Sequence, residues 1–235
     1  MDRRQLFPAA LLALAVATAT PALAAKPPQT WDGLIQIKTK RFDLVYLAPG
    51  ATFTGYTKVK LDPTEVSFEK NWRRDYNSQG IGVSRDISEK DVQKAITQGV
   101  SAASDVFVEE FTKGGYPVVT EAGPDVLWLR TGVLNVRVTA PDTMDAGRTY
   151  TFANDAGEAT YFVEFRDSQT GALLGRAIDR RVAGDNTIGQ RNRVTNRSDF
   201  RRLVERWAEL SILGLNELKA RAPVNEAGQF AGTAP

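Results

Sequence analysis

The sequence predicts an α+β protein, in which two long amphipathic helices pack on one face of a mostly antiparallel sheet. Two observations predict this class. Two long segments carry apolar residues at helical spacing, and several short segments between turns alternate apolar with polar residues. Strands joined by short turns pair antiparallel, and helices that stand apart from them in sequence can cover one face of their sheet.

Residues 160–181 carry the strongest strand signal and predict a β-hairpin. Apolar and polar side chains alternate through residues 161–166, and residues 173–178 carry the chain back. The segment between them, residues 167–171, is a cluster of turn formers that ends in Gly171, and glycine readily adopts a positive φ.

Further short strands are expected at residues 42–47, 57–61, 65–69, 116–120 and 126–139. Asp62-Pro63 should form a turn between the second and third of these. In the longest one the apolar positions change parity, from Leu127 and Leu129 to Leu134 and Val136. A change of parity at Gly132 predicts a β-bulge or a tight bend at that glycine.

The first helix is expected at residues 88–113 and the second from Ser198 to about Leu218. Ser88 and Asp91 stand at the positions of a capping box, and Gly114-Gly115 should end the first helix. Ser198 is the expected cap of the second helix.

The remaining segments predict loops and a single domain. Residues 71–86 are polar with two glycines and predict a surface loop, while residues 182–196 lack periodicity and predict a mobile loop. The tail from Pro223 is small and polar, which predicts disorder over residues 223–235. One domain is therefore expected over residues 25–222.

Composition excludes several kinds of chemistry. The 235 residues include no cysteine and no histidine, so disulfides, thiolate nucleophiles, Ser-His-Asp triads and imidazole metal sites are ruled out. The formal net charge of +2 gives no argument for nucleic-acid binding. We therefore lean against an enzyme, and we expect no cofactor and no metal site.

Residues 1–24 predict a signal peptide. Arg3 and Arg4 precede a short apolar run, and Ala22-Leu23-Ala24 is a small-x-small cleavage site before Ala25. The apolar run is shorter than the roughly 20 residues that span a bilayer, although an uncleaved N-terminal anchor is the alternative. We expect no transmembrane segment after cleavage and a location in the periplasm.

The local excess of positive charge lies in residues 176–206, with nine arginines against four acidic residues. It predicts a basic face that could bind an acidic envelope protein, an anionic lipid or a polysaccharide. The alternative is a solvated helix face with internal Asp–Arg pairs, which contribute little to stability. The candidate binding residues on this face are Arg180, Arg181, Arg201 and Arg202.

Trp72 is the remaining candidate, because it stands beside Arg73 and Arg74 and could form an exposed cation–π recognition patch. The alternative, which we favour, is that it covers an edge of the core. Two carboxylates could also come together as a hydrolytic pair, but sequence does not give their separation. Gly80 and Gly82 lack the Lys-Ser/Thr of a P-loop, and no calcium-loop pattern is visible.

Several phrases resemble a bacterial family of exported proteins of unknown function (DUF3313), whose members are usually described as lipoproteins. They are the WDGL opening at residue 31, LDPTEVSF at 61, GPDVLWLR at 123, and DSQTG with DRR in the 160–181 hairpin. The resemblance covers about residues 31–218 and implies no assigned activity. The chain departs from many relatives because it has no cysteine that could be lipidated.

On physical grounds Trp31 in the WDGL phrase should be a buried anchor and Asp32-Gly33 a turn. Together these observations favour a periplasmic, non-catalytic binding or accessory module of the cell envelope. A carboxylate-dependent envelope hydrolase is the alternative. A deep site with paired carboxylates of raised pKa would favour the hydrolase.

Overall fold

The computed structural model describes residues 26–78, 86–138, 151–153, 157–184, 189–191, 193–221 and 223–230. The expected signal peptide at residues 1–24 lies outside this part. Within it, an eight-stranded sheet has the order β1-β2-β3-β9-β8-β6-β4, and β5 also pairs with β6. These strands are β1 (Thr30–Trp31), β2 (Leu34–Ile37), β3 (Leu44–Leu47), β4 (Lys58–Leu61), β5 (Glu65–Phe68), β6 (Val126–Val138), β8 (Gly157–Asp167) and β9 (Leu173–Ala183).

The sheet is mostly antiparallel, as the sequence predicts, with β8 and β9 forming the expected hairpin at its centre. The exception is the β6 edge, where β4 and β5 both run parallel to β6. The predicted turn at Asp62-Pro63 is therefore a break between two strands that follow the same edge in the same direction. Proline has no N–H to donate to the ladder, which accounts for a break at Pro63. A separate small sheet pairs β7 (Thr151–Ala153) with β10 (Gly189–Arg191).

Three helices lie in the described part: α1 (Trp72–Ser78), α2 (Glu89–Lys113) and α3 (Arg193–Ala220). The predicted capping box is present, since the Ser88 hydroxyl accepts the Asp91 N–H and the Asp91 carboxylate accepts the Ser88 N–H. The α3 helix begins before the expected cap at Ser198. In the described part of the loop expected at residues 182–196, the chain instead forms the end of β9, the β10 strand and the start of α3, while residues 185–188 and 192 lie outside that part. A surface loop was expected at residues 71–86, but α1 forms at its start.

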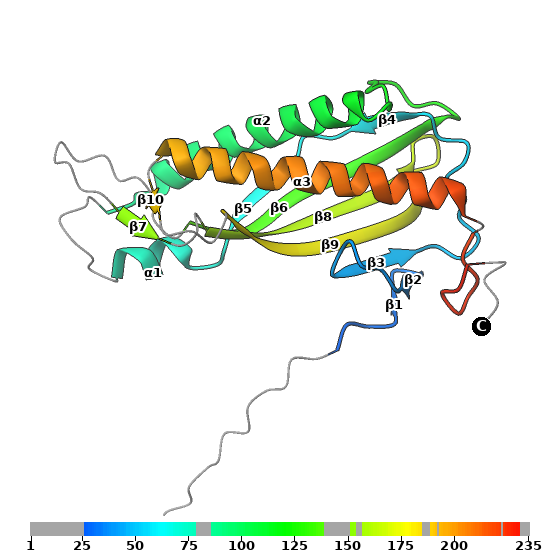
Figure 1. Cartoon of the computed structure of the whole chain (residues 1–235), viewed down its shortest axis with the longest axis horizontal. Helices are drawn as coiled ribbons and strands as arrows, with labels where there is room; N and C mark the ends of the chain where they lie inside the picture. Colours follow the sequence, from blue (N-terminus) through cyan, green and yellow to red (C-terminus); the bar gives the residue numbers. More distant parts are fainter. Residues whose placement is uncertain are drawn as a thin grey trace, which may run out of the picture.

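The hydrophobic core lies where α2 and α3 run side by side across the sheet (Figure 1). At its centre the Tyr161 ring of β8 stacks between Phe107 of α2, at 5.6 Å, and Trp207 of α3, at 5.3 Å. The Tyr161 hydroxyl is hydrogen-bonded to the Ser211 hydroxyl at 3.0 Å, so this ring is buried without leaving its polar atom unpaired. Full burial of each such side chain contributes about 1.5–3 kcal/mol.

The predicted bulge in β6 exists, but it lies three residues beyond Gly132. Val133 still faces the core, and the pairing with β8 shifts between Leu134 and Arg137, where Asn135 has a φ of 52°. Gly132 stays in register with Phe162 of β8, whose ring packs directly over it and requires a residue without a side chain. A Cβ there would lie 2.1 Å from that ring.

Residues 223–230, which we expected to be disordered, fold back onto the domain. Val224 is only 2% exposed, its carbonyl accepts the Gly50 N–H, and it forms a β-bridge with Phe230. The Asn225 side chain accepts two backbone N–H groups of the turn between them. The small polar composition is therefore that of a tight turn rather than of a disordered tail.

Candidate functional site: the open face of the sheet

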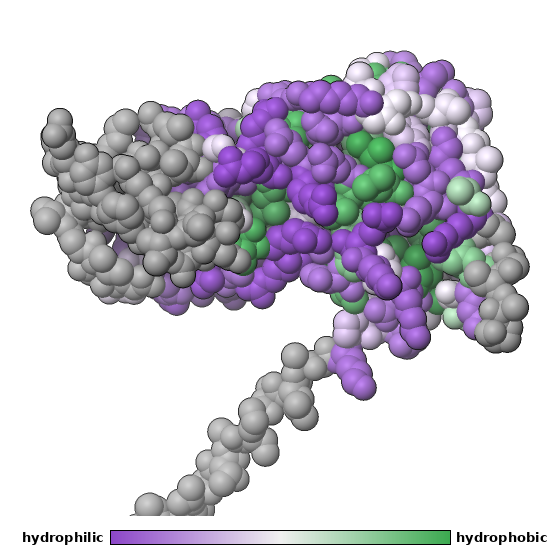
Figure 2. All heavy atoms as spheres, in the orientation of Figure 1, coloured by the Kyte–Doolittle hydropathy of each residue, from purple (hydrophilic) through white to green (hydrophobic). Residues whose placement is uncertain are grey.

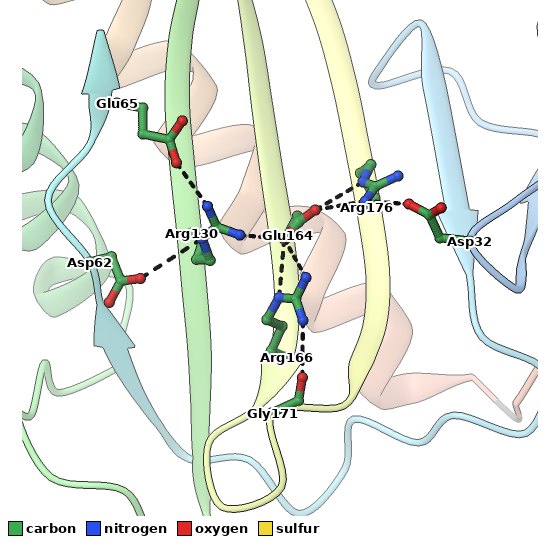
Figure 3. Close-up of polar contacts among 8 residues, drawn as sticks. All are labelled: Asp32, Asp62, Glu65, Arg130, Glu164, Arg166, Gly171 and Arg176. Carbon is green, nitrogen blue, oxygen red and sulfur yellow. Dashed lines mark hydrogen bonds and ion pairs between the residues drawn. The ribbon is translucent and has the colours of Figure 1, made fainter.

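A cluster of charged and aromatic residues occupies the face of β6, β8 and β9 that points away from α2 and α3, here called the open face. Successive strand residues point to opposite sides of a sheet. Because Val163 and Phe165 point into the core, Glu164 and Arg166 must point to the open face. Figure 3 views this face with helices behind the strands.

Three arginines surround the carboxylate of Glu164. Arg176 donates to it at 2.7 and 3.2 Å, Arg166 donates at 2.9 and 3.0 Å, and Arg130 reaches it at 3.4 Å (Figure 3). The antiparallel register makes this arrangement possible, because it places Glu164 directly opposite both Arg130 in β6 and Arg176 in β9. The cluster thus depends on three strands being in register.

Glu164 is 7% exposed, and its charge is maintained by these arginines. Burial alone would raise its pKa, but hydrogen bonds from Arg176 and Arg166, together with their charges, outweigh burial and hold the pKa below its usual value. A carboxylate in this state accepts hydrogen bonds and does not serve as a proton donor near neutral pH. Glu164 therefore orders the arginines and does not resemble a general acid.

Peripheral groups complete the network around the arginines. Arg130 pairs with Glu65 at 2.9 Å and with Asp62 at 4.0 Å. Arg176 pairs with Asp32 at 3.0 Å, and Arg166 donates to the Gly171 carbonyl in the β8–β9 turn at 3.0 Å. Three arginines thus face four carboxylates, so the cluster carries no large excess of either charge.

Local turn chemistry brings two of these partners into place. Asp32 and Gly33 both have positive φ, 51° and 78°, which is the geometry of a type I′ hairpin turn between β1 and β2. At the β8–β9 turn, the Asp167 carboxylate accepts the N–H groups of Gln169 and Thr170, and Gly171 has a φ of 73°. The expected turns at both places are confirmed.

Two tryptophans flank the arginines. The guanidinium of Arg176 lies 4.1 Å from the centre of the Trp31 ring, and Arg166 and Lys60 each lie 5.8 Å from that of Trp128. Trp31 is 39% exposed, so the expectation of a buried anchor is wrong. Its ring covers the edge of Tyr46 and leaves much of its own surface in solvent.

Two hydrogen-bond donors on the open face lack an acceptor within the described residues. They are the indole N–H of Trp128 and Nη1 of Arg176, and both are buried. A buried donor without an acceptor costs roughly 1–3 kcal/mol. Both donors lie in side chains that already contact a charged or aromatic neighbour.

The predicted basic face is not one surface. Strand alternation places Arg180 and Arg181 on opposite sides of the sheet, and only Arg180 points to the open face. Arg201 and Arg202 lie on α3. Each of the four has a carboxylate partner in the described part: Glu158 for Arg180, Asp179 for Arg181, Glu109 and Glu205 for Arg201, and Asp199 for Arg202. This pairing favours the alternative of a solvated, internally paired surface.

Trp72, the fifth candidate, lies at the start of α1 and is 8% exposed. Its ring stacks between Phe68, at 4.7 Å, and Tyr76, at 6.0 Å, and its indole N–H donates to the Val138 carbonyl at 3.1 Å. These contacts favour a role at the edge of the core over one in recognition.

Sequence reasoning did not identify Trp31, Trp128, Glu164, Arg166 and Arg176 as one site. A signal existed in β8, where Glu164 and Arg166 alternate with core residues and so must share the other face. Which residues of the neighbouring strands meet them depends on register, and register follows from pairings between segments far apart in sequence.

The described residues hold no group of three or more acidic side chains that could bind a metal ion. No helix within them is long and apolar enough to cross a membrane. Hydrogen bonds and ion pairs lower the pKa values of five carboxyl groups in the described part of the chain, those of Glu109, Asp125, Glu164, Asp167 and Glu217.

The chain belongs to the family described as Protein of unknown function (DUF3313), whose family model matches residues 28–211. No curated protein is significantly similar to it. Among solved structures, it resembles PelC from a Paraburkholderia phytofirmans dodecamer, with 13% identity and a TM-score of 0.37, over 73% of this chain and 95% of that chain.

Two further solved structures show a similar degree of likeness. Protein XCC0632 from Xanthomonas campestris has 10% identity and a TM-score of 0.38, over 73% of this chain and 90% of that one. A neuraminyllactose-binding hemagglutinin homolog from Helicobacter pylori has 11% identity and a TM-score of 0.28, over 74% and 92% of the two chains. These values are too low to carry an inference about function.

Proposed function

We propose that the protein is an exported, non-catalytic binding module of the bacterial cell envelope that docks on a partner protein through the open face of its sheet. The observation that carries this proposal is the position of Arg176. Its guanidinium is held between the Glu164 carboxylate and the exposed Trp31 ring, and one of its nitrogens lacks an acceptor in the described part of the chain. Arginine and tryptophan anchors of this kind are enriched at the centres of protein interfaces.

The charge balance favours a protein over a polyanion. Three arginines and four carboxylates nearly neutralise one another, whereas a surface that binds phosphates or acidic polysaccharide would present an excess of cations. Beside this cluster, the half-buried side chains of Leu44, Phe162 and Ile178 stand on the same face of adjacent strands. Apolar area next to fixed polar anchors is typical of a protein interface.

The hydrolase alternative receives less support. Glycoside hydrolysis of the usual kind needs one carboxylic acid whose pKa is raised. In the described part of the chain, ion pairs and hydrogen bonds instead lower the pKa values of Glu109, Asp125, Glu164, Asp167 and Glu217.

The test is capture of partner proteins from an envelope extract on purified protein, with Trp31→Ala as the open-face variant and Arg201→Ser/Arg202→Ser as the helix-face control. We expect a partner that wild type and control retain and that Trp31→Ala loses. Titration of that purified partner should then give an affinity at least tenfold weaker for Trp31→Ala, because truncating a central anchor costs about 2 kcal/mol or more.

Two results would overturn the proposal. Retention of the partner by Trp31→Ala with loss by the Arg201→Ser/Arg202→Ser variant would move the site to the helix face. Recovery of no specific protein by any variant would reject a docking role. Light scattering on the purified protein would show whether the captured partner is a second copy of this chain.

A further inference from the structure

A groove with a volume of about 1420 Å³ lies on the helix side of the sheet, on the opposite face from the Arg–Glu cluster. It runs between the β2–β3 edge and the C-terminal half of α3, and residues 227–230 line part of it. Figure 2 shows this side of the molecule, where apolar side chains lie between hydrophilic ones below that part of α3. Ordinary ligand pockets occupy roughly 300–1,000 Å³, so this groove can hold a long molecule.

The floor of the groove is apolar. Val45, Leu47, Phe165, Ala177 and Leu218 line it, and four of them come from strands whose core-facing positions continue under α3. Ser211 also lines the groove, but its hydroxyl is already bonded to the Tyr161 hydroxyl and the Trp207 carbonyl. The floor therefore presents apolar side chains to a ligand, and the Ser211 hydroxyl is not available to bond it.

A glycine in α3 keeps the groove open. Gly214 lines it, and a Cβ at this position would have only one neighbour within 4 Å, the Phe42 ring at 3.9 Å. Glycine in a helix interior costs about 1 kcal/mol relative to alanine. The helix thus carries a destabilising residue at a position where a larger side chain would fill the groove.

The rim carries excess positive charge. Four basic residues line the groove, Lys38, Lys40, Arg41 and Arg221, against the two acidic residues Asp43 and Glu217. Arg41 and Glu217 pair with each other across it at 2.5 Å, and Asp43 accepts the backbone N–H of Arg180. Lys38 and Lys40 are exposed and, within the described residues, have no ion-pair partner.

We propose that this groove binds a single-chain anionic amphiphile, a long-chain fatty acid, with its hydrocarbon chain on the apolar floor and its carboxylate at Lys38 and Lys40. Burial of hydrocarbon contributes about 0.8 kcal/mol per methylene, so the chain supplies the affinity. The unpaired ammonium groups at the rim supply the preference for an anion. This site goes beyond the proposed docking role, because it lies on the other side of the sheet.

Calorimetric titration of the purified protein with laurate, below the concentration at which laurate forms micelles, tests the proposal. We expect saturable binding of one laurate by wild type. Gly214→Leu should weaken it at least tenfold, because the added side chain enters the groove, whereas Gly214→Ala should retain it. The double variant Lys38→Ser/Lys40→Ser should weaken laurate several-fold and leave dodecanol unchanged.

Circular dichroism checks that Gly214→Leu is folded. If that variant is unfolded, the laurate affinity of Lys38→Ser/Lys40→Ser tests the proposal instead. The proposal is overturned if wild type shows no saturable binding, or if folded Gly214→Leu binds laurate as wild type does. It is equally overturned if the lysine variant binds laurate with unchanged affinity.

Discussion

The indole N–H of Trp207 in α3 donates a hydrogen bond of 2.9 Å to the carboxylate of Asp179 in β9, inside the core. The same carboxylate accepts Nε of Arg181 at 2.5 Å and the backbone N–H of Asp43 at 3.3 Å. One buried side chain therefore links α3, β9 and the segment before β3. Polar contacts of this kind fix how a helix is placed over a sheet, which apolar contacts alone leave less defined.

Asp179→Ala should lower the free energy of unfolding by about 2–4 kcal/mol, because it leaves the Trp207 N–H buried without an acceptor. Urea denaturation followed by circular dichroism measures this. Arg180→Met, at the next strand position but with its side chain 64% exposed, should cost less than about 1 kcal/mol. Equal losses in the two variants would show that the buried bond contributes nothing beyond the surface pair.

Glu164→Gln should destabilise the protein by about 3 kcal/mol, because it removes the counter-charge of three arginines on the open face. The matched control is Glu65→Gln, which removes an exposed carboxylate from Arg130 alone and should cost less than about 1 kcal/mol. Urea denaturation of both variants gives the comparison, and a smaller loss in Glu164→Gln than in Glu65→Gln would contradict the central position of Glu164.

Acid should weaken the fold partly through Glu164. Its folded pKa lies below the usual value of 4.5, so the unfolded chain binds its proton more readily. The stability that Glu164 contributes is therefore present above pH 4.5 and is lost as the pH falls through the folded pKa. The free energy of unfolding of Glu164→Gln should decline less steeply than that of wild type between about pH 5 and pH 3, and parallel declines would count against this assignment.

Alkali should weaken the fold through Tyr56. Burial, the hydrogen bond to Asp167 and the charge of that carboxylate raise the pKa of Tyr56 to about 12. Because the folded value exceeds the unfolded value of 10, the stabilisation is complete below pH 10 and is lost as the pH rises toward 12. Tyr56→Phe should show a flatter decline over this range, and spectroscopic titration of tyrosinate should lose one late-titrating group.

Gly157→Ala should destabilise the protein by more than about 2 kcal/mol. Gly157 has a φ of 141°, and a Cβ there would lie 1.8 Å from the carbonyl oxygen of Arg137 on the paired strand. Gly214→Ala, where a Cβ fits and the helix gains, should instead stabilise by about 0.5–1 kcal/mol. Thermal unfolding of the two variants should therefore shift in opposite directions, and a shift in the same direction would contradict this reading of the two glycines.

Some parts of the site follow from local sequence, and others depend on pairing between distant segments. The turns at Asp32-Gly33 and at residues 167–171 follow from local residue preferences, and both form as predicted. Arg176 meets Glu164 within the hairpin of β8 and β9, but its meeting with Trp31 depends on pairings across more than 100 residues, such as that of Tyr46 with Arg176. The arginines chosen from local charge density lie on several surfaces, because neighbouring strand residues point to opposite faces.

The sequence by itself determined the α+β class, the central hairpin, the cap of α2 and the exclusion of cysteine and histidine chemistry. Each of these depends on composition or on residues close together in the chain, whose preferences act locally. Tertiary structure decided the parallel edge of β4 and β5, the bulge at Asn135, the open-face cluster and the groove beside Gly214. These depend on register and packing between distant segments, where the contacts of many residues together outweigh any single local preference.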